Sequence, residues 1–510
     1  MDNLFKKFKV KDVLIMIFGI LILIGTGAFI LEKTRFLFVV DSDVLWHIKT
    51  GDFILSHGYV PKVDVFSWHE GLNWIPHEWL YDVFLSIIYS GFGLKGIMFL
   101  SAVILACRIG YVTIYNVKVK KENIWGYSIF AACMLILIGY TWAVGRPLEI
   151  TMLVILTNLI VFIQKRKPCV YYVTLGISSI IMANIHGGAI WIIFAPVVIS
   201  MIVDFVYFWK NNKTEEGIEH KKEAISKLIA IIIGLGASII NPRGLEVYNY
   251  FIKMLFTSAS RATNTIAEWQ PINFISAFAA LMYLLVFVSF AFNKKIYKLE
   301  KKDITKLLII SFWGVGMLRY CRLTPIFIFT VLLWGYEYVR SFAEYMIKCF
   351  KLEKAFILVK ILSIIAGIAF IILTQVMALK WINYYFAHDE KELMKDGFPT
   401  LSIKYLKDNN IRTKIYNDDW GSWMLWNDIP TFMDGRCDPF VEEFSPGNDQ
   451  FVEAAEIDSL DDYLAIFNKY DIEYVFLKYN KDTQILLEST GNWETVVVEP
   501  RAMLFKRKDV

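Results

Sequence analysis

The chain is poor in the residue patterns that build metal centres and disulfide frameworks. It has six cysteines and seven histidines in 510 residues, and none of the cysteines stands in a C-x-x-C or C-x-x-H pattern. The sequence therefore indicates neither a zinc site nor a disulfide scaffold. We interpret the cysteines as small apolar residues in packed regions. They are Cys107, Cys133, Cys169, Cys321, Cys349 and Cys437.

Charged residues are scarce as well, at 20% of the chain, whereas hydrophobic residues make up 56%. In a chain of this length the balance predicts repeated membrane-spanning segments rather than one water-soluble core. The net charge of +4 is small, and we expect no nucleic-acid partner. The sequence has no evident internal repeat, which argues against a transporter built from inverted repeats.

Hydrophobic runs recur along the first three quarters of the chain, and about 20 apolar residues are needed to cross a bilayer. We predict a mainly α, polytopic bundle of about eleven membrane-spanning helices, the second interrupted at Gly91-Phe92-Gly93. The basic start looks like a signal peptide, but no small-residue cleavage site follows, so we expect the first span to be retained. The predicted spans are residues 13–31, 83–117, 124–143, 149–163, 170–183, 188–208, 228–240, 274–292, 304–317, 323–339 and 355–379.

Lysine is concentrated in alternate loops, whereas the loops between them hold single arginines in compact polar motifs. By the positive-inside rule, the lysine-rich loops and the N-terminus lie in the cytoplasm, and eleven crossings place the C-terminus outside. All the polar motifs then fall on the outer face. They are Gly145-Arg146-Pro147, Asn184-Ile185-His186-Gly187, Asn241-Pro242-Arg243-Gly244, Ala267-Glu268-Trp269-Gln270-Pro271 and Leu318-Arg319-Tyr320-Cys321-Arg322.

The composition changes after residue 379, where apolar runs become short and acidic residues frequent. We predict residues 1–380 as a transmembrane domain with a catalytic first outer loop at 32–82, and residues 381–510 as an extracytoplasmic soluble α/β domain. The pattern there predicts helices at 399–409, 420–426, 448–456 and 459–470, and strands at 413–416, 431–433, 474–477, 494–498 and 502–506.

Acidic and histidine residues are densest in residues 40–81, directly after the first predicted span. This density indicates an active site at a membrane face, and the alternative is a solvated loop that only joins two helices. Apolar residues at near-helical spacing predict an amphipathic interfacial helix at 44–57. Asp41 and Asp43 would lie at its N-terminus, where a carboxylate can cap a helix. One cap needs one carboxylate, so Asp43 is the better functional candidate.

The motifs of this stretch resemble those of the GT-C glycosyltransferases. The pattern D-x-D-x-x-W-H-x-x-x-G at residues 41–51 is followed by V-P-x-x-D-x-F-S at 60–67 and H-E-W-L at 77–80. These patterns, with segments 415–425 and 433–438, are similar to a poorly characterised bacterial branch of the enzymes that use polyprenyl-phosphate sugars. The resemblance covers the whole chain in architecture. It implies transfer of a sugar from a lipid-phosphate carrier to an acceptor at the outer face of the membrane.

Transfer to an acceptor hydroxyl needs a group that takes its proton, and a positioned carboxylate contributes roughly 10²–10⁴-fold to such a step. Asp43 is the predicted base. Asp41, His77 and Glu78 are predicted either to orient the acceptor or to hold a divalent metal such as Mg²⁺ or Mn²⁺. The predicted metal ligands are Asp41, Asp43 and His77.

The departing lipid phosphate calls for cationic donors near the membrane face. Topology places four arginines there, and the alternative for each is an anchor whose head reaches the lipid headgroups. His186 is a weaker candidate of the same kind, and Glu268 is predicted either to complete the pocket or to cap an interfacial helix. The four arginines are Arg146, Arg243, Arg319 and Arg322.

Two further groups have structural interpretations. Trp46, Trp68, Trp74 and Trp79 fit an aromatic belt at the bilayer interface better than a sugar platform. Residues 434–438 hold two aspartates and an arginine, and we interpret them as a buried turn with an ion pair, because they are far in sequence from the first outer loop.

The resemblance predicts a membrane glycosyltransferase. The Lys-, Ile- and Asn-rich composition fits an AT-rich bacterial genome, so we expect the membrane to be a bacterial plasma membrane. The expected partners are a polyprenyl-phosphate-linked sugar donor, membrane lipids and a glycan, lipid or protein acceptor. Two other classes remain open: a transporter or flippase for lipid-linked glycans, and a non-enzymatic assembly protein for surface polysaccharide.

Overall fold

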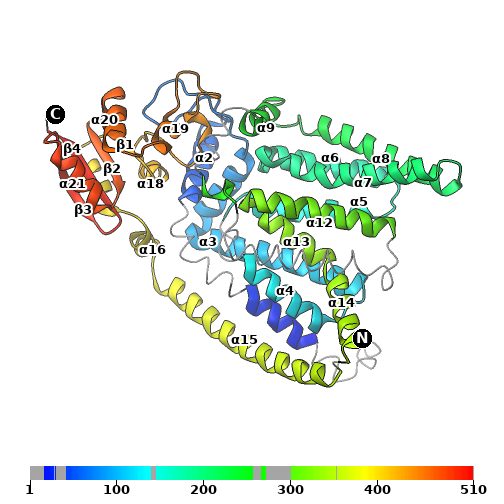
Figure 1. The fold of residues 1–510 in the computed structure, drawn as a ribbon. Coiled ribbons are helices and arrows are strands. Elements are labelled where there is room, and N and C mark those ends of the chain that lie inside the picture. The colour runs from blue at the N-terminus through cyan, green and yellow to red at the C-terminus, as the bar shows by residue number, and fades with distance from the viewer. Residues whose placement is uncertain are drawn as a thin grey trace.

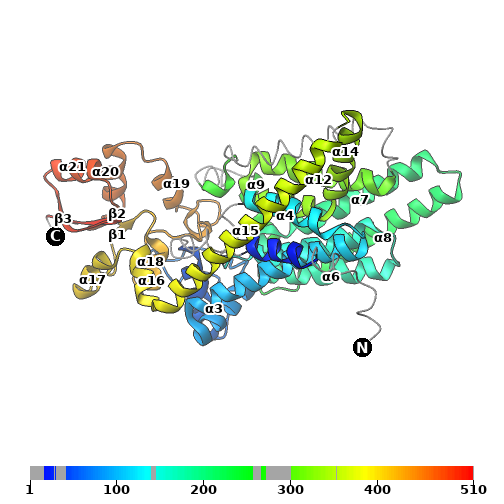
Figure 2. The same ribbon diagram turned by 90° about the horizontal axis from the view of Figure 1, so that it is seen from below.

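A helical bundle leads through one long helix to a small sheet at the other end of the molecule (Figure 1 and Figure 2). The computed structural model describes residues 16–27, 29, 42–138, 145–256, 266–271, 300–351 and 353–508. The first described helix is Met16–Gly27. The helices that follow are α2 (Asp43–His57), α3 (Trp79–Ile114), α4 (Ile124–Ile138), α5 (Leu148–Ile163), α6 (Pro168–Ile185), α7 (Trp191–Lys210), α8 (Glu215–Ala237), α9 (Glu246–Phe256), α12 (Lys301–Arg319), α13 (Thr324–Trp334), α14 (Tyr336–Cys349) and α15 (Glu353–Ala387).

Most predicted spans fall on a described helix, with bounds that differ by several residues. Helix α8 begins at Glu215 rather than at residue 228, because Thr214 caps it by accepting the Gly217 N–H. The predicted span 323–339 is divided into α13 and α14, which are bent by 61°. The predicted span 274–292 lies outside the described residues.

Several helices have the length and composition of membrane spans, as expected for a membrane protein. Three described helices qualify outright, and a fourth if the bent pair is one span. Four shorter apolar helices accompany them. The count of eleven spans therefore stays a prediction. The three helices are Trp79–Val119, Pro168–Ile185 and Gly187–Lys210.

Helix α3 is broken where the sequence predicts an interruption. Gly93 has φ 63° and ψ −163°, a conformation that only glycine adopts readily. The part of α3 before this break packs along α2, and a Cβ at Gly51 of α2 would overlap the backbone carbonyl of Asp82. Glycine at position 51 therefore allows the middle of α2 to approach the first turn of α3 closely.

The predicted amphipathic helix at 44–57 is present as α2, one residue longer at its start. Its apolar residues Val44, Leu45 and Ile48 are buried against protein, and α18 (Gly421–Trp426) also packs on it. The helix is therefore enclosed more fully than an interfacial helix lying on a bilayer. Ser42 makes no side-chain capping hydrogen bond, and Asp41 lies outside the described residues.

The C-terminal part holds a four-stranded sheet in the order β1-β2-β4-β3. Strands β1 and β2 are parallel, and the other neighbours are antiparallel. The strands are β1 (Ile415–Asn417), β2 (Tyr474–Lys478), β3 (Trp493–Glu499) and β4 (Ala502–Arg507). The remaining helices are α16 (Glu390–Gly397), α17 (Thr400–Asp408), α19 (Gln450–Ala455), α20 (Leu460–Lys469) and α21 (Lys481–Ser489). Helices α16 and α21 were not predicted.

The predicted strand at 431–433 is wrong. Thr431 forms an isolated bridge with Ser67 of the first loop instead of joining the sheet. Its N–H donates to Phe66 O, and its carbonyl accepts the Trp68 N–H. These backbone groups are satisfied by a segment far away in sequence, so no local pattern of strand residues marks the pairing.

The two faces of the sheet pack into different hydrophobic clusters, as the alternation of side chains along a strand requires. Val475 and Leu477 face one cluster, which α20 covers together with Leu487 of α21. Phe476 and Leu504 face the other cluster, which also contains residues of α2 and α3. The sheet therefore shares a hydrophobic core with α2 and α3.

A buried arginine fastens the C-terminal part to the first loop. Arg436 Nη1 lies 2.5 Å from Asp64 Oδ1, and Arg436 Nη2 lies 2.6 Å from Asp434 Oδ2. The guanidinium also lies 4.5 Å from the centre of the Trp74 ring. Burial alone would raise the pKa of Asp64, but Arg436 and the hydrogen bonds from Ser67 outweigh it and lower that pKa overall. The predicted ion pair of this turn is confirmed, with a second partner in the first loop.

We expect Arg436→Met to destabilise the protein strongly, because it leaves Asp64 and Asp434 buried without a counter-charge. Breaking a buried pair in this way costs about 3–5 kcal/mol. The matched control is Lys478→Ala, which removes an exposed pair with Asp419 and should cost about 1 kcal/mol or less. Thermal unfolding in detergent compares the two, and equal losses would show that the buried cluster adds no stability.

Candidate active site

Two adjoining cavities lie where the loops between helices meet the C-terminal part. The first, named here the polar chamber, has a volume of about 150 Å³ and is lined by acidic, arginine and tryptophan side chains. The second, the apolar groove, has a volume of about 910 Å³, and its apolar walls come largely from α7 and α12. The residues that line both are His77, Glu78, Tyr250, Trp269 and Arg322.

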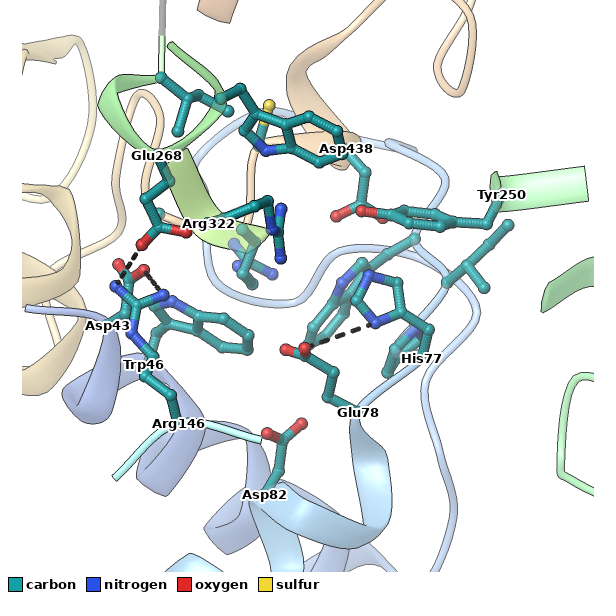
Figure 3. Close-up of a pocket in the computed structure, with 18 residues that line it drawn as sticks. Asp43, Trp46, His77, Glu78, Asp82, Arg146, Tyr250, Glu268, Arg322 and Asp438 are labelled. Carbon is teal, nitrogen blue, oxygen red and sulfur yellow. Dashed lines mark ion pairs between the residues drawn. The ribbon is translucent and has the colours of Figure 1, made fainter. Parts of the chain in front are cut away.

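One side of the chamber holds an arginine between two carboxylates (Figure 3). Arg146 Nη1 lies 2.6 Å from Asp43 Oδ2, and Arg146 Nη2 lies 3.4 Å from Glu268 Oε1. Asp43 is the first residue of α2, and Glu268 belongs to a short 3₁₀ turn, Ala267–Trp269. The ion pairs join three distant segments and orient the Asp43 carboxylate.

A buried hydrogen-bond network positions Arg146. The preceding Gly145 has φ 62°, and its N–H donates to Ser101 Oγ over 3.0 Å. Ser101 Oγ in turn donates to Glu149 Oε2 over 3.1 Å. This fixes the turn before α5 against α3, so the arginine points into the chamber with little freedom.

The other side of the chamber holds Glu78 among three histidines. Its carboxylate lies 3.5 Å from His186 Nε2, 3.8 Å from His47 Nε2 and 4.0 Å from His77 Nδ1. Burial raises the pKa of Glu78 to about 8, although Arg146 and Arg322 pull it down. Burial also lowers the pKa of His77 to about 3. Glu78 is therefore a carboxyl group that can hold or release a proton near neutral pH.

The segment 435–438 closes the chamber from the C-terminal side. A Cβ at Gly435 would overlap Asp43 Oδ1, so glycine lets this backbone approach the carboxylate. Asp438 also lines the chamber and lies beside Tyr250 (Figure 3). The chamber is thus built jointly by the first loop, the helical bundle and the C-terminal part.

The junction of chamber and groove is formed by aromatic rings and one arginine. The Arg322 guanidinium lies 4.5 Å from the centre of the Trp269 ring. Beyond it, the groove is lined by apolar side chains of α7 and α12, among them Trp191, Ile199 and Phe312. A cation at the mouth of an apolar groove suits a ligand with an anionic head and a hydrocarbon chain.

No protein-family model matches the chain, and no curated protein matches it in sequence. Among solved structures, it is similar to the Archaeoglobus fulgidus oligosaccharyltransferase tethered to an acceptor peptide with the NVT sequon. The TM-score is 0.52 at 12% identity, covering 90% of this chain and 69% of the other. The same enzyme in complex with Zn and sulfate gives a TM-score of 0.46 at 12% identity, covering 90% and 68%.

The chain therefore shares the fold of the Archaeoglobus fulgidus oligosaccharyltransferase. This confirms the resemblance in its first motifs at the level of the fold.

The structure brings together most of the residues that the sequence singled out. Six of them line the chamber, and His186 lines the groove and contacts Glu78. Arg243 and Arg319 line neither cavity: Arg243 pairs with Glu246 at 2.5 Å, and Arg319 is exposed beside Tyr320. The six are Asp43, His77, Glu78, Arg146, Glu268 and Arg322.

Sequence reasoning missed several residues of the chamber. Asp82 and Tyr250 were not singled out, and Trp46 was assigned to an aromatic belt, yet all three line the chamber. Asp438 was assigned to a structural turn on the ground of its distance in sequence from the first loop. That ground is wrong, because the loop and the turn meet at this chamber. Trp46 and Asp438 are the last residues of the D-x-D-x-x-W and M-D-G-R-x-D motifs, and this position in a motif could have marked them as site residues.

A possible metal-binding triad occurs elsewhere in the bundle. Among the described residues, only Asp204, His220 and Glu223 bring three ligating atoms within 4.8 Å of one another. Lys301 Nζ lies 2.6 Å from Asp204, 3.0 Å from His220 Nδ1 and 2.8 Å from Glu223. The ammonium group therefore occupies the place that a cation would take. Metal binding by Asp41, Asp43 and His77 stays a prediction, because Asp41 lies outside the described residues.

The raised pKa of Glu78 makes stability depend on pH. The folded state holds this proton up to about pH 8, whereas an unfolded glutamate releases it near 4.5. Its stabilising contribution is therefore complete below about pH 4.5 and is lost towards pH 8, by up to about 1.4 kcal/mol per pH unit. In detergent, the melting temperature of the wild type should fall more steeply with pH than that of Glu78→Gln.

The control for this comparison is Glu494→Gln, an exposed glutamate of β3. It should follow the wild-type pH profile. If the Glu78→Gln profile is as steep as that of the wild type, the carboxyl does not titrate between these pH values.

Proposed function

We propose that the protein is a membrane glycosyltransferase that moves a sugar from a polyprenyl-phosphate carrier to an acceptor at the outer face of a bacterial plasma membrane. The observation that carries this proposal is the junction at Arg322, where the apolar groove opens into the polar chamber. The groove suits the isoprenoid chain, and the chamber suits the sugar and the acceptor. The GT-C-type fold is consistent with this assignment.

The donor phosphate is proposed to lie at the junction, within reach of Arg322 and Arg146. Guanidinium groups form charge-assisted hydrogen bonds with phosphate oxygens and stabilise the charge that develops as the phosphate departs. Arg146 already contacts Asp43 and Glu268, so we assign the larger share of this charge to Arg322. Arg243 and Arg319 are not part of the proposal.

The proposed reaction is a displacement at the anomeric carbon. An acceptor oxygen bonds to that carbon, the bond from the carbon to the phosphate oxygen breaks, and polyprenyl phosphate leaves with the bonding electrons. Asp43 takes the acceptor proton as general base. Glu78 is the second proton carrier, since its raised pKa lets it exchange a proton near neutral pH.

The proposed orientation follows from the lysine distribution in the loops. The N-terminus is cytoplasmic, and residues 381–510 form an extracytoplasmic α/β domain beside the transmembrane residues 1–380. The chamber then faces the outer side, where lipid-linked sugars meet their acceptors. The acceptor class stays open between a glycan, a lipid and a protein.

We expect the wild type to release free polyprenyl phosphate from at least one donor in a panel of polyprenyl-phosphate sugars with candidate acceptors. Asp43→Asn should lower this release by about 10²–10⁴-fold, since it removes the general base. Mass spectrometry of the lipid products measures both. Asp52→Asn is the matched control, because Asp52 lies on the same helix outside the chamber. Donor binding without any cleavage by the wild type would instead favour a flippase or an assembly protein.

Filling the groove should weaken the use of long-chain donors. Val315 lines the groove and is 65% exposed, so Val315→Trp places a ring in the proposed path of the lipid. We expect the KM for a long-chain donor to rise by about tenfold or more, as for a loss of about 1.4 kcal/mol of binding. A donor with a short isoprenoid chain should be affected little. The control is Val206→Trp, an exposed position of α7 outside the groove. Equal effects of both variants would place the lipid elsewhere.

A further inference from the structure

Asp438 is a buried carboxylate that the C-terminal part contributes to the chamber. Its side chain is only 3% exposed and lines the cavity. The Ile75 N–H hydrogen-bonds the carboxylate, whereas Oδ2 has no hydrogen-bond partner among the residues that the structure describes. A buried carboxylate oxygen without a partner costs free energy unless a ligand or water supplies a donor.

Two more polar atoms of the chamber are in the same situation. Trp46 Nε1 and His77 Nδ1 are buried and make no hydrogen bond within the described part of the chain. Trp46 Nε1 is a donor only, and the role of His77 Nδ1 depends on its tautomer. The chamber therefore presents separate acceptor and donor positions to one ligand, as a group with several hydroxyls requires.

The place of Asp438 decides which substrate it faces. It lies beside Tyr250, which lines both the chamber and the groove (Figure 3). If the phosphate of the donor lies at this junction, the next group along the donor is the transferred sugar. The rings of Trp74, Tyr250 and Trp269 line the same space and offer apolar surface to the faces of a sugar ring.

The charges around this space disfavour an acidic sugar. Asp43, Glu78, Asp82, Glu268 and Asp438 all line the chamber, and burial raises the pKa of Glu78 and Asp438, so this space disfavours negative charge. Arg146 is paired with two of these carboxylates, and Arg436 is paired with Asp64 and Asp434. With Arg322 assigned to the donor phosphate, a second acidic group on the ligand would be buried among acidic side chains without an unpaired cation beside it.

We propose that Asp438 accepts a hydrogen bond from a hydroxyl of the transferred sugar, with Trp46 Nε1 donating to another, and that the chamber selects an uncharged polyhydroxyl sugar. This inference rests on the proposed function and adds the substrate class and two residues that determine specificity.

The test compares donors that differ by one hydroxyl. The probes are the neutral polyprenyl-phosphate hexose that the wild type cleaves fastest, its deoxy analogues and the corresponding uronate. Leaving a buried sugar hydroxyl without its hydrogen-bond partner corresponds to about 5- to 150-fold in kcat/KM. We expect Asp438→Ala to lose this factor on the parent donor and to equal the wild type on one deoxy analogue. The wild type should use the uronate poorly. Asp438→Asn should reduce the difference in kcat/KM between the hexose donor and the uronate donor.

A second variant keeps the test independent of folding. Trp46→Phe retains an aromatic ring and removes the Nε1 donor, so it should erase discrimination at a different hydroxyl. Asp461→Asn, an exposed change on α20, is the control for handling and should match the wild type. A loss by Asp438→Ala that is equal on every donor would mean a structural role and overturn the inference. A wild type that cleaves no donor would instead overturn the proposed function.

Discussion

The arrangement of the site depends on the burial of Arg436 between Asp64 and Asp434. An arginine charge that far from water is tolerated only with close counter-charges and good geometry, and this pair of carboxylates comes from opposite ends of the chain. The same guanidinium lies against Trp74, which lines the chamber. One electrostatic cluster thus holds the first loop, the aromatic lining and the segment 435–438 in register.

The two sides of the chamber differ in electrostatic character. Around Arg146, opposite charges are paired at short range and are partly exposed. Around Glu78, burial dominates, and it lowers the pKa of His47, His77 and His186, so these imidazoles give little counter-charge. A chamber with one charged and one protonatable side can neutralise a departing anion and still exchange a proton within the same small volume.

Local patterns in the sequence predicted those features that local forces create. Helical spacing located α2, and the glycines of residues 91–93 marked the break in α3. Local patterns did not predict the tertiary contacts. Residues 431–433 have strand composition, but their hydrogen bonds go to the first loop. Arg146 and Arg243 stand in similar glycine and proline motifs, and only the packing of the bundle directs the first into the chamber and leaves the second beside Glu246. Distance along the chain likewise gave no measure of how near Asp438 lies to the first loop.

The hydrophobic cluster shared by the sheet, α2 and α3 restricts how a ligand can enter and leave the chamber. Phe476 and Leu504 pack into the same cluster as Val44 of α2 and Leu85 of α3. Swinging the C-terminal part away as a lid would expose these side chains to water, at roughly 25 cal/mol for each Å² of apolar surface. We therefore expect the C-terminal part to stay closed over the chamber. A lipid-linked ligand would then enter laterally from the bilayer, along the groove between α7 and α12. The lipid carrier without its transferred group would leave by the same route.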